Sequence, residues 1–323
     1  MALLLSEGDV RSLLTMPMAL DAVEDAFRKL AAGEGQLHPR RRLELPENAF
    51  LHYMAAADTV SGYMGMKIYT SVRGALRFLV PLYRARNGEL VALIEADYLG
   101  QMRTGAASGI ATKYMARSDA RVIGILGTGL QARTQLQAIC AVRKIERVRA
   151  FGRNPEKRAQ FAVEMTAKLG LPVEPVRSAE EAVRGADIVV TITTSSRPVV
   201  EGAWLSPGAH INAAGGNFPQ KRELNDAAIA RVGLFAADSV EQSKLEAGDL
   251  IQPFASDPAR WNDVRELADI VAGKSPGRTS ADQITLFKSN GIAIEDLAVA
   301  ARVFELAVER QVGTRFPLWE HCG

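Results

Sequence analysis

Three small residues in the stretch GILGTGLQARTQ, residues 124–135, have the spacing that binding of a dinucleotide requires. Gly127 permits a tight turn, Gly129 lets the backbone approach a pyrophosphate, and Ala132 lets a helix pack closely on a strand. The competing interpretation is a glycine turn that binds no ligand. An apolar strand pattern before the loop and a helical pattern after it favour phosphate binding at a helix N-terminus. We therefore expect cofactor contacts from Gly127, Thr128, Gly129, Leu130, Gln131 and Ala132.

The next strand pattern ends in AFGRNPEK, residues 150–157, where the ribose of the cofactor would lie. Enzymes that use NAD commonly carry an Asp or Glu at this point, whereas this chain has Gly152 followed by Arg153. The absence of a carboxylate and the presence of an arginine at this point favour a ribose with a 2′-phosphate. NADP(H) is therefore the preferred cofactor and NAD(H) the alternative. A solvated loop arginine is the competing interpretation. Further expected cofactor contacts at this strand end are Gly152, Arg153 and Asn154.

Two basic residues stand where a charge is costly to bury. Lys67 interrupts the apolar strand pattern YMGMKIYTS, and Arg103 opens the small-residue helical pattern RTGAASGIATKYMAR. Both suit a site for a buried anionic ligand. The structural alternative is an ion pair with an acid such as Glu95 or Asp97.

The order of elements along the chain indicates an α/β fold. A helical pattern at residues 18–31 precedes several extended patterns, with RNGE as a hairpin turn, and this indicates an antiparallel sheet. From Ala120 onward, apolar strand patterns alternate with helical ones, which predicts a parallel sheet covered on both faces. One long amphipathic helical pattern follows over residues 289–313.

Composition excludes several classes of function. The 323 residues favour two domains, and 47% hydrophobic and 24% charged residues with a net charge of +2 are ordinary for a globular protein. Neither a nucleic-acid-binding bias nor an apolar run of roughly 20 residues is present. The start of the chain lacks the features of a signal peptide. Cys140 and Cys322 form neither a disulfide framework nor a metal motif, so we expect a cytoplasmic protein without a metal or a membrane partner.

Several segments in order resemble the ornithine cyclodeaminase/μ-crystallin family: MGMKIYT, LGQMRTGAASGIATKYMAR, GILGTGLQART, RGADIVVTITTSSRPVV, GAHINAAGGNFPQKREL and LFKSNGIAIEDLA. The resemblance implies a homodimer built through a discontinuous α+β domain for substrate binding and dimerisation, residues 1–117 and 292–323. It further implies a Rossmann-type domain with a doubly wound parallel sheet, residues 118–291.

The resemblance also implies roles for individual residues. Lys67 matches the family's active-site lysine, and Arg103 matches an arginine that binds the substrate carboxylate. In HPRRRLEL, Arg40 best matches a second such arginine, although Arg42 shares its strand face. By resemblance Ser289 lies near the nicotinamide. Thr193 ends a strand pattern, where ligands of open parallel sheets gather, and Thr104 is expected at a helix start within reach of a phosphate. Helix or strand capping is the competing interpretation for each.

Two departures from the cyclodeaminases bear on the reaction. Asn217 stands where those enzymes carry an aspartate needed for deamination, and an amide cannot take up a proton as a carboxylate does. His52 stands two residues before Met54, where the cyclodeaminases have a glutamate. His52 is able to donate a proton or to order a water that does, and a structural histidine is the alternative.

The resemblance, together with these departures, leads us to expect an NAD(P)H-dependent reductase of small cyclic ketimines with an α-carboxylate. The expected substrates are Δ1-pyrroline-2-carboxylate or its six-membered homologue, which give L-proline or L-pipecolate. Lys67, Arg40 and Arg103 would hold the carboxylate, and the proton would come from His52, Lys67 or water, near Asn217. The alternatives are reductive amination of a 2-oxo acid, cyclodeamination of ornithine, and binding of NADPH and a small ligand without turnover.

Overall fold

The computed structural model describes residues 1–318, and their contacts divide into two compact units. Unit 1 comprises Met1–Arg103 together with the described residues from Gly291 onward, and unit 2 comprises Thr104–Asn290. Cys322 lies outside the described residues.

Unit 1 is built on a sheet with the strand order β15-β1-β6-β5-β4-β3-β2. Its pairs are antiparallel except for β1 with β6, and the β5–β6 hairpin turns at Gly88, whose φ is +71°. The RNGE pattern therefore predicted this turn correctly. The strands are β1 (Ala2–Leu5), β2 (Gly35–Leu45), β3 (Ala49–Asp58), β4 (Tyr63–Val72), β5 (Ala75–Arg84), β6 (Leu90–Glu95) and β15 (Thr314–Phe316).

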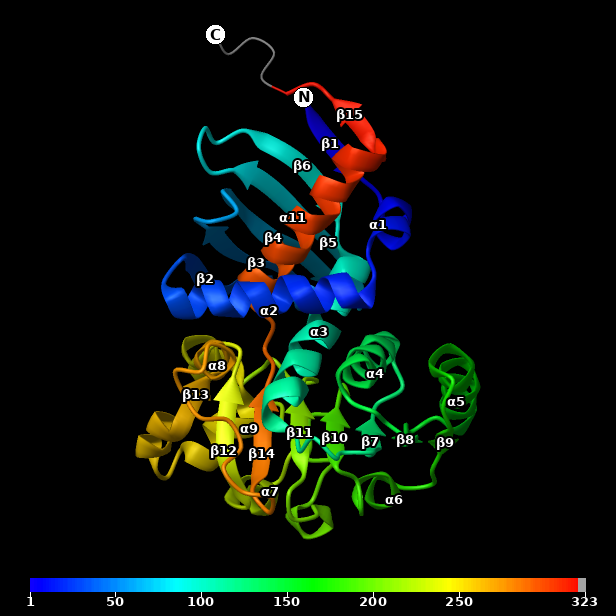
Figure 1. Ribbon diagram of the computed structural model, residues 1–323. Coiled ribbons are helices and arrows are strands. Elements are labelled where there is room, and N and C mark those ends of the chain that lie inside the picture. The colour runs from blue at the N-terminus through cyan, green and yellow to red at the C-terminus, as the bar shows by residue number, and fades with distance from the viewer. Residues whose placement is uncertain (319–323) are drawn as a thin grey trace. The chain divides into compact units, whose positions relative to one another are not determined.

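Helix α11 (Ala293–Arg310) lies across one face of this sheet, against β2 to β5, with α2 (Met16–Ala32) packed beside it (Figure 1). Ile294, Leu297 and Phe304 recur at helical spacing and are buried, so α11 presents an apolar stripe to the strands. Strand β3 alternates to match: His52 and Met54 are buried on the α11 side. Unit 1 also contains α1 (Glu7–Leu13), η1 (Pro46–Asn48) and the start of α3 (Asp97–Met115).

Unit 2 contains a parallel sheet with the strand order β13-β12-β14-β11-β10-β7-β8-β9. The chain runs outward from β7 to β8 and β9, then returns to β10 on the other side, as in a doubly wound Rossmann-type fold. The predicted fold class is therefore confirmed, although β9, β13 and β14 carried no clear pattern. The strands are β7 (Val122–Leu126), β8 (Arg147–Phe151), β9 (Val173–Pro175), β10 (Ile188–Thr191), β11 (His210–Ala213), β12 (Val232–Ala237), β13 (Val264–Glu266) and β14 (Ile284–Lys288).

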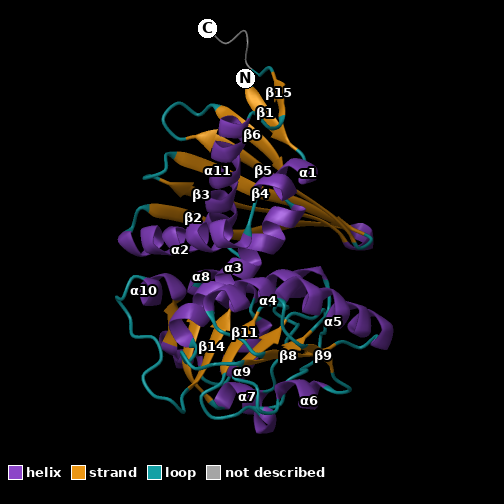
Figure 2. Ribbon diagram, turned by 45° about the vertical axis from the view of Figure 1, so that its right-hand side comes forward, coloured by secondary structure: helices purple, strands orange, loops and turns teal. Residues whose placement is uncertain are grey.

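Helices cover both faces of the sheet in unit 2, with α4 and α5 on one side and α6 and α7 on the other (Figure 2). Every residue of β10 and β11 is buried, as expected for strands enclosed on both faces. The helices are α4 (Leu130–Val142), α5 (Pro155–Leu169), α6 (Ala179–Val183), α7 (Asp226–Ala230), α8 (Val240–Glu246), α9 (Gly248–Phe254), α10 (Leu267–Val271), η2 (Gly202–Trp204) and η3 (Pro258–Asp263).

The contact units differ from the expected domain bounds along α3. From Thr104 onward this helix clusters with unit 2, whereas residues up to 117 were expected in the first domain. Close packing explains the difference: a Cβ on Gly105 would lie 2.5 Å from the carbonyl oxygen of Thr134, and Asn212 Nδ2 donates to Thr112 Oγ1 at 3.0 Å. The small residues of α3 therefore serve helix packing within unit 2.

Candidate active site

The glycine loop after β7 has the geometry that dinucleotide binding needs. Gly127 has a φ of +108°, and a Cβ there would lie 2.3 Å from the carbonyl oxygen of Ile192. Gly127 N–H donates to the carbonyl of Phe151 at 2.9 Å, which ties the loop to the end of β8. Only glycine satisfies both the backbone angle and the space at this position. Ala132 is fully buried against the sheet, as expected from its size.

Gly129 is the N-cap of α4, and no side chain caps this helix. A Cβ at Gly129 would meet nothing within 4 Å. The first turn of α4, which contains Leu130 and Gln131, therefore presents its N–H groups beside open space. This arrangement fits a pyrophosphate on the helix N-terminus.

The end of β8 carries the residues expected at the ribose. Thr128 Oγ1 lies over Gly152, where a Cβ would approach it to 2.5 Å. Arg153 is exposed, and the Asn154 side chain caps α5 by accepting from Lys157 N–H at 2.8 Å. Asn154 thus has a structural role in addition to the expected cofactor contact.

Arg133, a second arginine near this loop, is held by other groups of the protein. Its guanidinium donates from Nε to Glu164 Oε1 at 2.7 Å and from Nη1 to the carbonyl of Gly129 at 3.0 Å. The pair joins α4 to α5. Arg153 therefore presents an exposed cation at this edge, whereas Arg133 is engaged in structure.

The remaining expected residues of unit 2 follow adjacent parallel strands. Thr193 comes after β10, Asn217 after β11, and Ser289 directly after β14. In the parallel sheet β14 pairs with β11, β11 with β10, and β10 with β7, so the carboxyl ends of these strands meet at one edge. Ligands of open α/β sheets bind at this edge. Thr104 is the exception: α3 begins at Asp97, so Thr104 lies in its interior and not at a helix start. It is buried, and its carbonyl accepts from Gln135 Nε2 at 3.1 Å.

A buried ionic network that the sequence analysis missed supports two of these loops. The Glu223 carboxylate accepts from Thr193 N–H at 2.7 Å and from Gly215 N–H at 3.0 Å. Asp249 accepts from Glu223 N–H at 2.6 Å and pairs with Lys288 Nζ at 2.9 Å. Glu223, Asp249 and Lys288 are all fully buried. Burial and the charge of Asp249 raise the pKa of Glu223.

Unit 1 brings the expected substrate-binding residues into one buried cluster. Lys67 Nζ pairs with Asp296 Oδ1 at 2.8 Å, and Arg103 Nε reaches the same oxygen at 3.1 Å. Arg103 Nη1 also pairs with Glu295 Oε2 at 2.9 Å. The expected acid partners, Glu95 and Asp97, are therefore corrected to Glu295 and Asp296. These two acids lie in the first turn of α11, far away in sequence, where periodicity gave no signal for an ion pair.

Arg40 completes the cluster from β2. Its guanidinium is buried and donates from Nη2 to the carbonyl of Gly291 at 2.9 Å, and it lies 3.9 Å from Met54 Sδ. Arg42 is half-buried, and its Nε donates to His52 Nδ1 at 3.3 Å. His52 also stacks on Tyr69, with ring centroids 4.3 Å apart. His52 therefore has the contacts of a positioned structural histidine.

The environment changes the acidity of these groups. Burial, together with the charge of Arg103, lowers the pKa of Lys67 to about 8, although Asp296 opposes the shift. Burial and the charges of Arg42 and Arg40 lower the pKa of His52 to about 4. Burial acts to lower the pKa of Arg103, but Asp296 and Glu295 raise it above its ordinary value. At neutral pH Lys67 is therefore charged, whereas His52 is a neutral imidazole.

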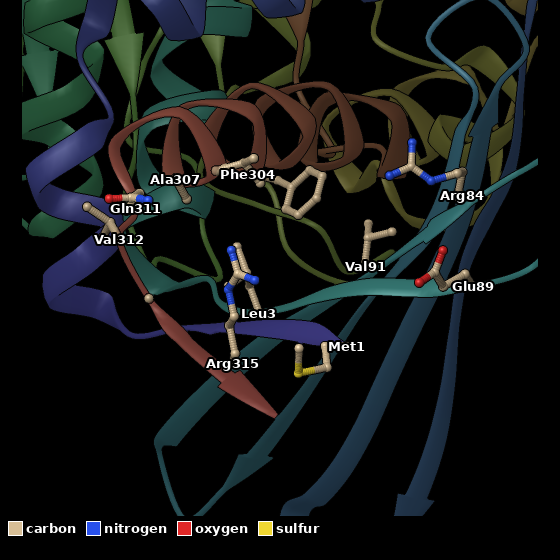
Figure 3. A pocket seen from close by; sticks show the side chains of 12 residues that line it. Met1, Leu3, Arg84, Glu89, Val91, Phe304, Ala307, Gln311, Val312 and Arg315 are labelled. Atoms are coloured by element: carbon tan, nitrogen blue, oxygen red, sulfur yellow. The ribbon is translucent and has the colours of Figure 1, made fainter. Parts of the chain in front are cut away.

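A separate cavity of about 420 Å³ lies in unit 1 near the C-terminal end of α11 (Figure 3). Phe304 points into it from α11, opposite Leu3 and Val91 of the sheet, with Arg84 and Glu89 at one side. None of the expected substrate-binding residues lines this cavity. We therefore do not assign it as the candidate active site.

Within residues 1–318 no helix is long and apolar enough to cross a membrane. The same residues contain no group of His, Cys, Asp and Glu side chains arranged to hold a metal ion.

Comparison with known proteins places these features in one family. Residues 2–311 match the ornithine cyclodeaminase/mu-crystallin family. A Delta(1)-pyrroline-2-carboxylate reductase of Bacillus cereus is 37% identical over 325 residues, covering 97% of this chain and 99% of the relative.

Solved structures of similar proteins have the same fold as this chain. Thermococcus litoralis Delta(1)-pyrroline-2-carboxylate reductase in complex with NADH and L-proline superposes with a TM-score of 0.93 at 38% identity, covering 97% of this chain and 100% of that one. An archaeal alanine dehydrogenase dimer with bound NAD has a TM-score of 0.92 at 35% identity, covering 98% of this chain and 99% of that one.

The family resemblance inferred from sequence motifs is thus confirmed. The chain is a nicotinamide-dependent oxidoreductase that acts on C=N and CH–NH bonds. It belongs to the ornithine cyclodeaminase/mu-crystallin family.

Proposed function

We propose that the protein reduces small cyclic ketimines that bear an α-carboxylate. The substrates are Δ1-pyrroline-2-carboxylate or Δ1-piperideine-2-carboxylate, and the products are L-proline or L-pipecolate. The observation that carries this proposal is the buried cluster of Arg40, Lys67 and Arg103 in unit 1, because three converging cations suit a carboxylate. Relatives whose names specify Delta(1)-pyrroline-2-carboxylate reductase, one of them with bound L-proline, support the same substrate class.

In this proposal the chain's residues orient the substrate and move one proton. The bound nicotinamide cofactor supplies the hydride. Arg40, Lys67 and Arg103 hold the carboxylate, which fixes the position of the imine carbon. Lys67, charged at neutral pH with a pKa of about 8, provides the proton for the nitrogen. His52 is neutral there, so it acts by orienting a group and not as an imidazolium acid.

For the cofactor we favour NADP(H) over NAD(H). Gly152 stands where NAD-dependent enzymes commonly have a carboxylate that accepts a hydrogen bond from the ribose, and the exposed cation Arg153 follows it. Arg153→Asp should therefore reverse the preference toward NADH. The comparison requires the apparent KM of both cofactors for each protein, and an unchanged ratio would count against this role for Arg153.

We further place the protein in the cytoplasm as a homodimer. The sheet face opposite α11 carries exposed or half-buried apolar side chains. Leu43 lies opposite Leu51, Tyr53 lies opposite Ile68, and Ile68 in turn lies opposite Leu79. An apolar face of this kind supports burial against a second copy of the chain. The archaeal alanine dehydrogenase relative is itself a dimer.

The first test is the loss of NADPH absorbance on adding Δ1-pyrroline-2-carboxylate, with NADH run alongside. Rapid oxidation with NADPH preferred supports both the substrate and the cofactor proposal. Binding of NADPH without its oxidation by the imine would overturn the reductase proposal.

The second candidate is reductive amination of a 2-oxo acid, since it uses the same carboxylate clamp and the alanine dehydrogenase relative is of comparable similarity. Pyruvate with ammonia in the same assay distinguishes the two reactions. Cyclodeamination of ornithine is less favoured, because Asn217 and His52 stand where the cyclodeaminases have an aspartate and a glutamate. Release of ammonia from ornithine by this protein would support cyclodeamination after all. Binding of NADPH and a small ligand without turnover predicts no oxidation by either substrate.

A further inference from the structure

The cavity beside the C-terminal end of α11 has an apolar wall and two charged groups at one side (Figure 3). Leu3 of β1, Val91 of β6 and Phe304 of α11 form the wall, and each is no more than 8% exposed. Ala307, nearly one turn after Phe304, is fully buried and small, so the helix does not fill the space against the sheet. The volume of about 420 Å³ is typical of a small-molecule site.

Arg84 and Glu89 reach the cavity from the two arms of one hairpin. They face each other across the β5–β6 hairpin, where Arg84 N–H donates to the carbonyl of Glu89 at 2.9 Å. Both side chains are half-buried. A cation and an anion therefore stand next to each other at the same side of the cavity, while Gln311 and the exposed Arg315 border its other end (Figure 3).

Neither of these two charges has an ionic partner among residues 1–318. Arg84 interacts with Tyr63, whose ring centre lies 6.0 Å from the guanidinium carbon, but its Nε is buried and has no hydrogen-bond partner there. The Glu89 carboxylate accepts one long hydrogen bond, from Nδ2 of the exposed Asn87 at 3.5 Å. A bound molecule that carries both charges would satisfy the two side chains at once.

We infer that this cavity is a binding site for a free α-amino acid with an apolar side chain. Arg84 pairs with the carboxylate of the ligand, and its Nε supplies one of the two parallel hydrogen bonds that a guanidinium gives to a carboxylate. Glu89 pairs with the ammonium group, which lies next to the carboxylate in every α-amino acid. The side chain of the ligand packs against Leu3, Val91 and Phe304.

This site is separate from the cluster that the proposed function uses. Asp296, which holds Lys67 and Arg103, lies in the first turn of α11, whereas Ala307 lies in the last turn. The two positions are roughly 16 Å apart along the helix axis, at the rise per residue of an α-helix. Neither Lys67 nor Arg103 lines the cavity. The inference therefore goes beyond the proposed function and does not depend on it.

The test compares L-leucine with two analogues that each lack one of its charges. Isocaproate has the same apolar chain and the carboxylate but no ammonium group, and isopentylamine has the ammonium group but no carboxylate. Each probe is titrated calorimetrically, at concentrations up to the millimolar range, into the full-length protein. The wild type should bind L-leucine about tenfold or more tightly than either analogue, because each analogue leaves one charged side chain without its hydrogen bond.

Two variants separate the roles of the two charges. Arg84→Gln should weaken L-leucine and isocaproate by about tenfold or more and should not weaken isopentylamine. Glu89→Gln should weaken L-leucine and isopentylamine by a similar factor and should not weaken isocaproate. Arg86→Gln is the matched control, because Arg86 is an exposed arginine of the same hairpin that does not line the cavity. Its dissociation constants should equal those of the wild type.

Three results would overturn the inference: no binding of L-leucine by the wild type, equally tight binding of an analogue, or unchanged L-leucine affinity in folded Arg84→Gln or Glu89→Gln. The wild-type comparison applies even where a variant fails to fold. L-leucine that binds at the substrate cluster instead would be lost in Lys67→Met and kept in Arg84→Gln, which also overturns the inference. A protein that binds L-leucine as expected but does not oxidise NADPH with Δ1-pyrroline-2-carboxylate would contradict the proposed function alone.

Discussion

At the scale of single residues, the charged side chains of unit 1 were recognisable because they interrupt apolar patterns. Lys67 and Arg103 each stand where burial of a lone charge is unfavourable, and both are buried. Their partners were not recognisable, because Asp296 is separated from Lys67 by 229 positions along the chain. The partner matters for chemistry, since Asp296 keeps the pKa of Lys67 from falling further.

The acidity of Lys67 predicts a pH dependence of the reduction. Burial lowers its pKa to about 8, so the ammonium is present below that pH and is lost as the pH rises through it. The value of kcat/KM for imine reduction should therefore fall above about pH 8. Lys67→Arg should keep its charge and move this decline to higher pH, at a lower maximal rate. A decline at the same pH in Lys67→Arg would assign it to another group.

At the scale of elements, the two glycines of the loop after β7 have different roles. Gly127 needs its positive φ and has no space for a Cβ, whereas Gly129 has ordinary backbone angles and open space beside it. The first glycine serves the fold of the loop. The second leaves open space at the N-terminus of α4, where we propose that the pyrophosphate of the cofactor lies.

This difference predicts unequal effects of adding one methyl group. Gly127→Ala should lower the melting temperature, because backbone strain and the contact with Ile192 both oppose it. Gly129→Ala should keep the wild-type melting temperature and weaken NADPH binding by about tenfold or more, since its Cβ enters the space of the pyrophosphate. Fluorescence titration of NADPH measures the second effect. Normal binding by a folded Gly129→Ala would exclude the loop as the phosphate site.

The buried ionic network of Glu223, Asp249 and Lys288, which supports the loops after β10 and β11, leads to a second prediction for this edge of the sheet. In Glu223→Gln, one of the two carboxylate oxygens is replaced by an amide NH2 group, which cannot accept a hydrogen bond. Either Thr193 N–H or Gly215 N–H therefore loses its acceptor. Loss of one buried acceptor should reduce stability by about 1–3 kcal/mol in denaturant unfolding and raise the dissociation constant of NADPH. Glu201→Gln, at an exposed position before η2, is the control and should change neither quantity. An unchanged dissociation constant in Glu223→Gln would confine the network to stability.

At the scale of the whole molecule, the two units combine two kinds of sheet. Unit 2 buries both faces of a parallel sheet under helices, whereas α11 covers one face of the sheet in unit 1. The opposite face of that sheet carries Leu43, Ile68 and Leu79, which are exposed or half-buried. This uncovered face is the feature of the chain that best fits self-association.

Leu79→Glu should therefore convert the proposed dimer to a monomer, because it places a charge within this apolar face, next to Ile68. Light scattering after size-exclusion chromatography gives the mass of each species. Leu245→Glu is the control, since Leu245 is a 50% exposed leucine on α8 of unit 2. A dimer that persists in Leu79→Glu would place the interface elsewhere.

The sequence by itself determined the features that arise from the spacing of neighbouring residues in the longer elements. Helical spacing predicted α2 and α11, and the turn residues predicted the hairpin at Gly88. Continuous apolar runs predicted β7, β8, β10, β11 and β12, because these strands are buried on both faces. The glycine spacing likewise predicted the loop at Gly127. Only the tertiary structure revealed that Arg103 and Thr104 lie inside α3, and that α3 from Thr104 onward clusters with unit 2.

Tertiary structure also decided which charges meet. Glu295 and Asp296 read in sequence as the acidic first turn of an amphipathic helix, and Glu223 and Asp249 as polar residues of loops and a short helix. Folding brings each of them against a buried cation or a loop N–H from a distant segment. Local spacing carries no information about such pairs, because the interaction depends on how sheets and helices pack and not on positions along the chain.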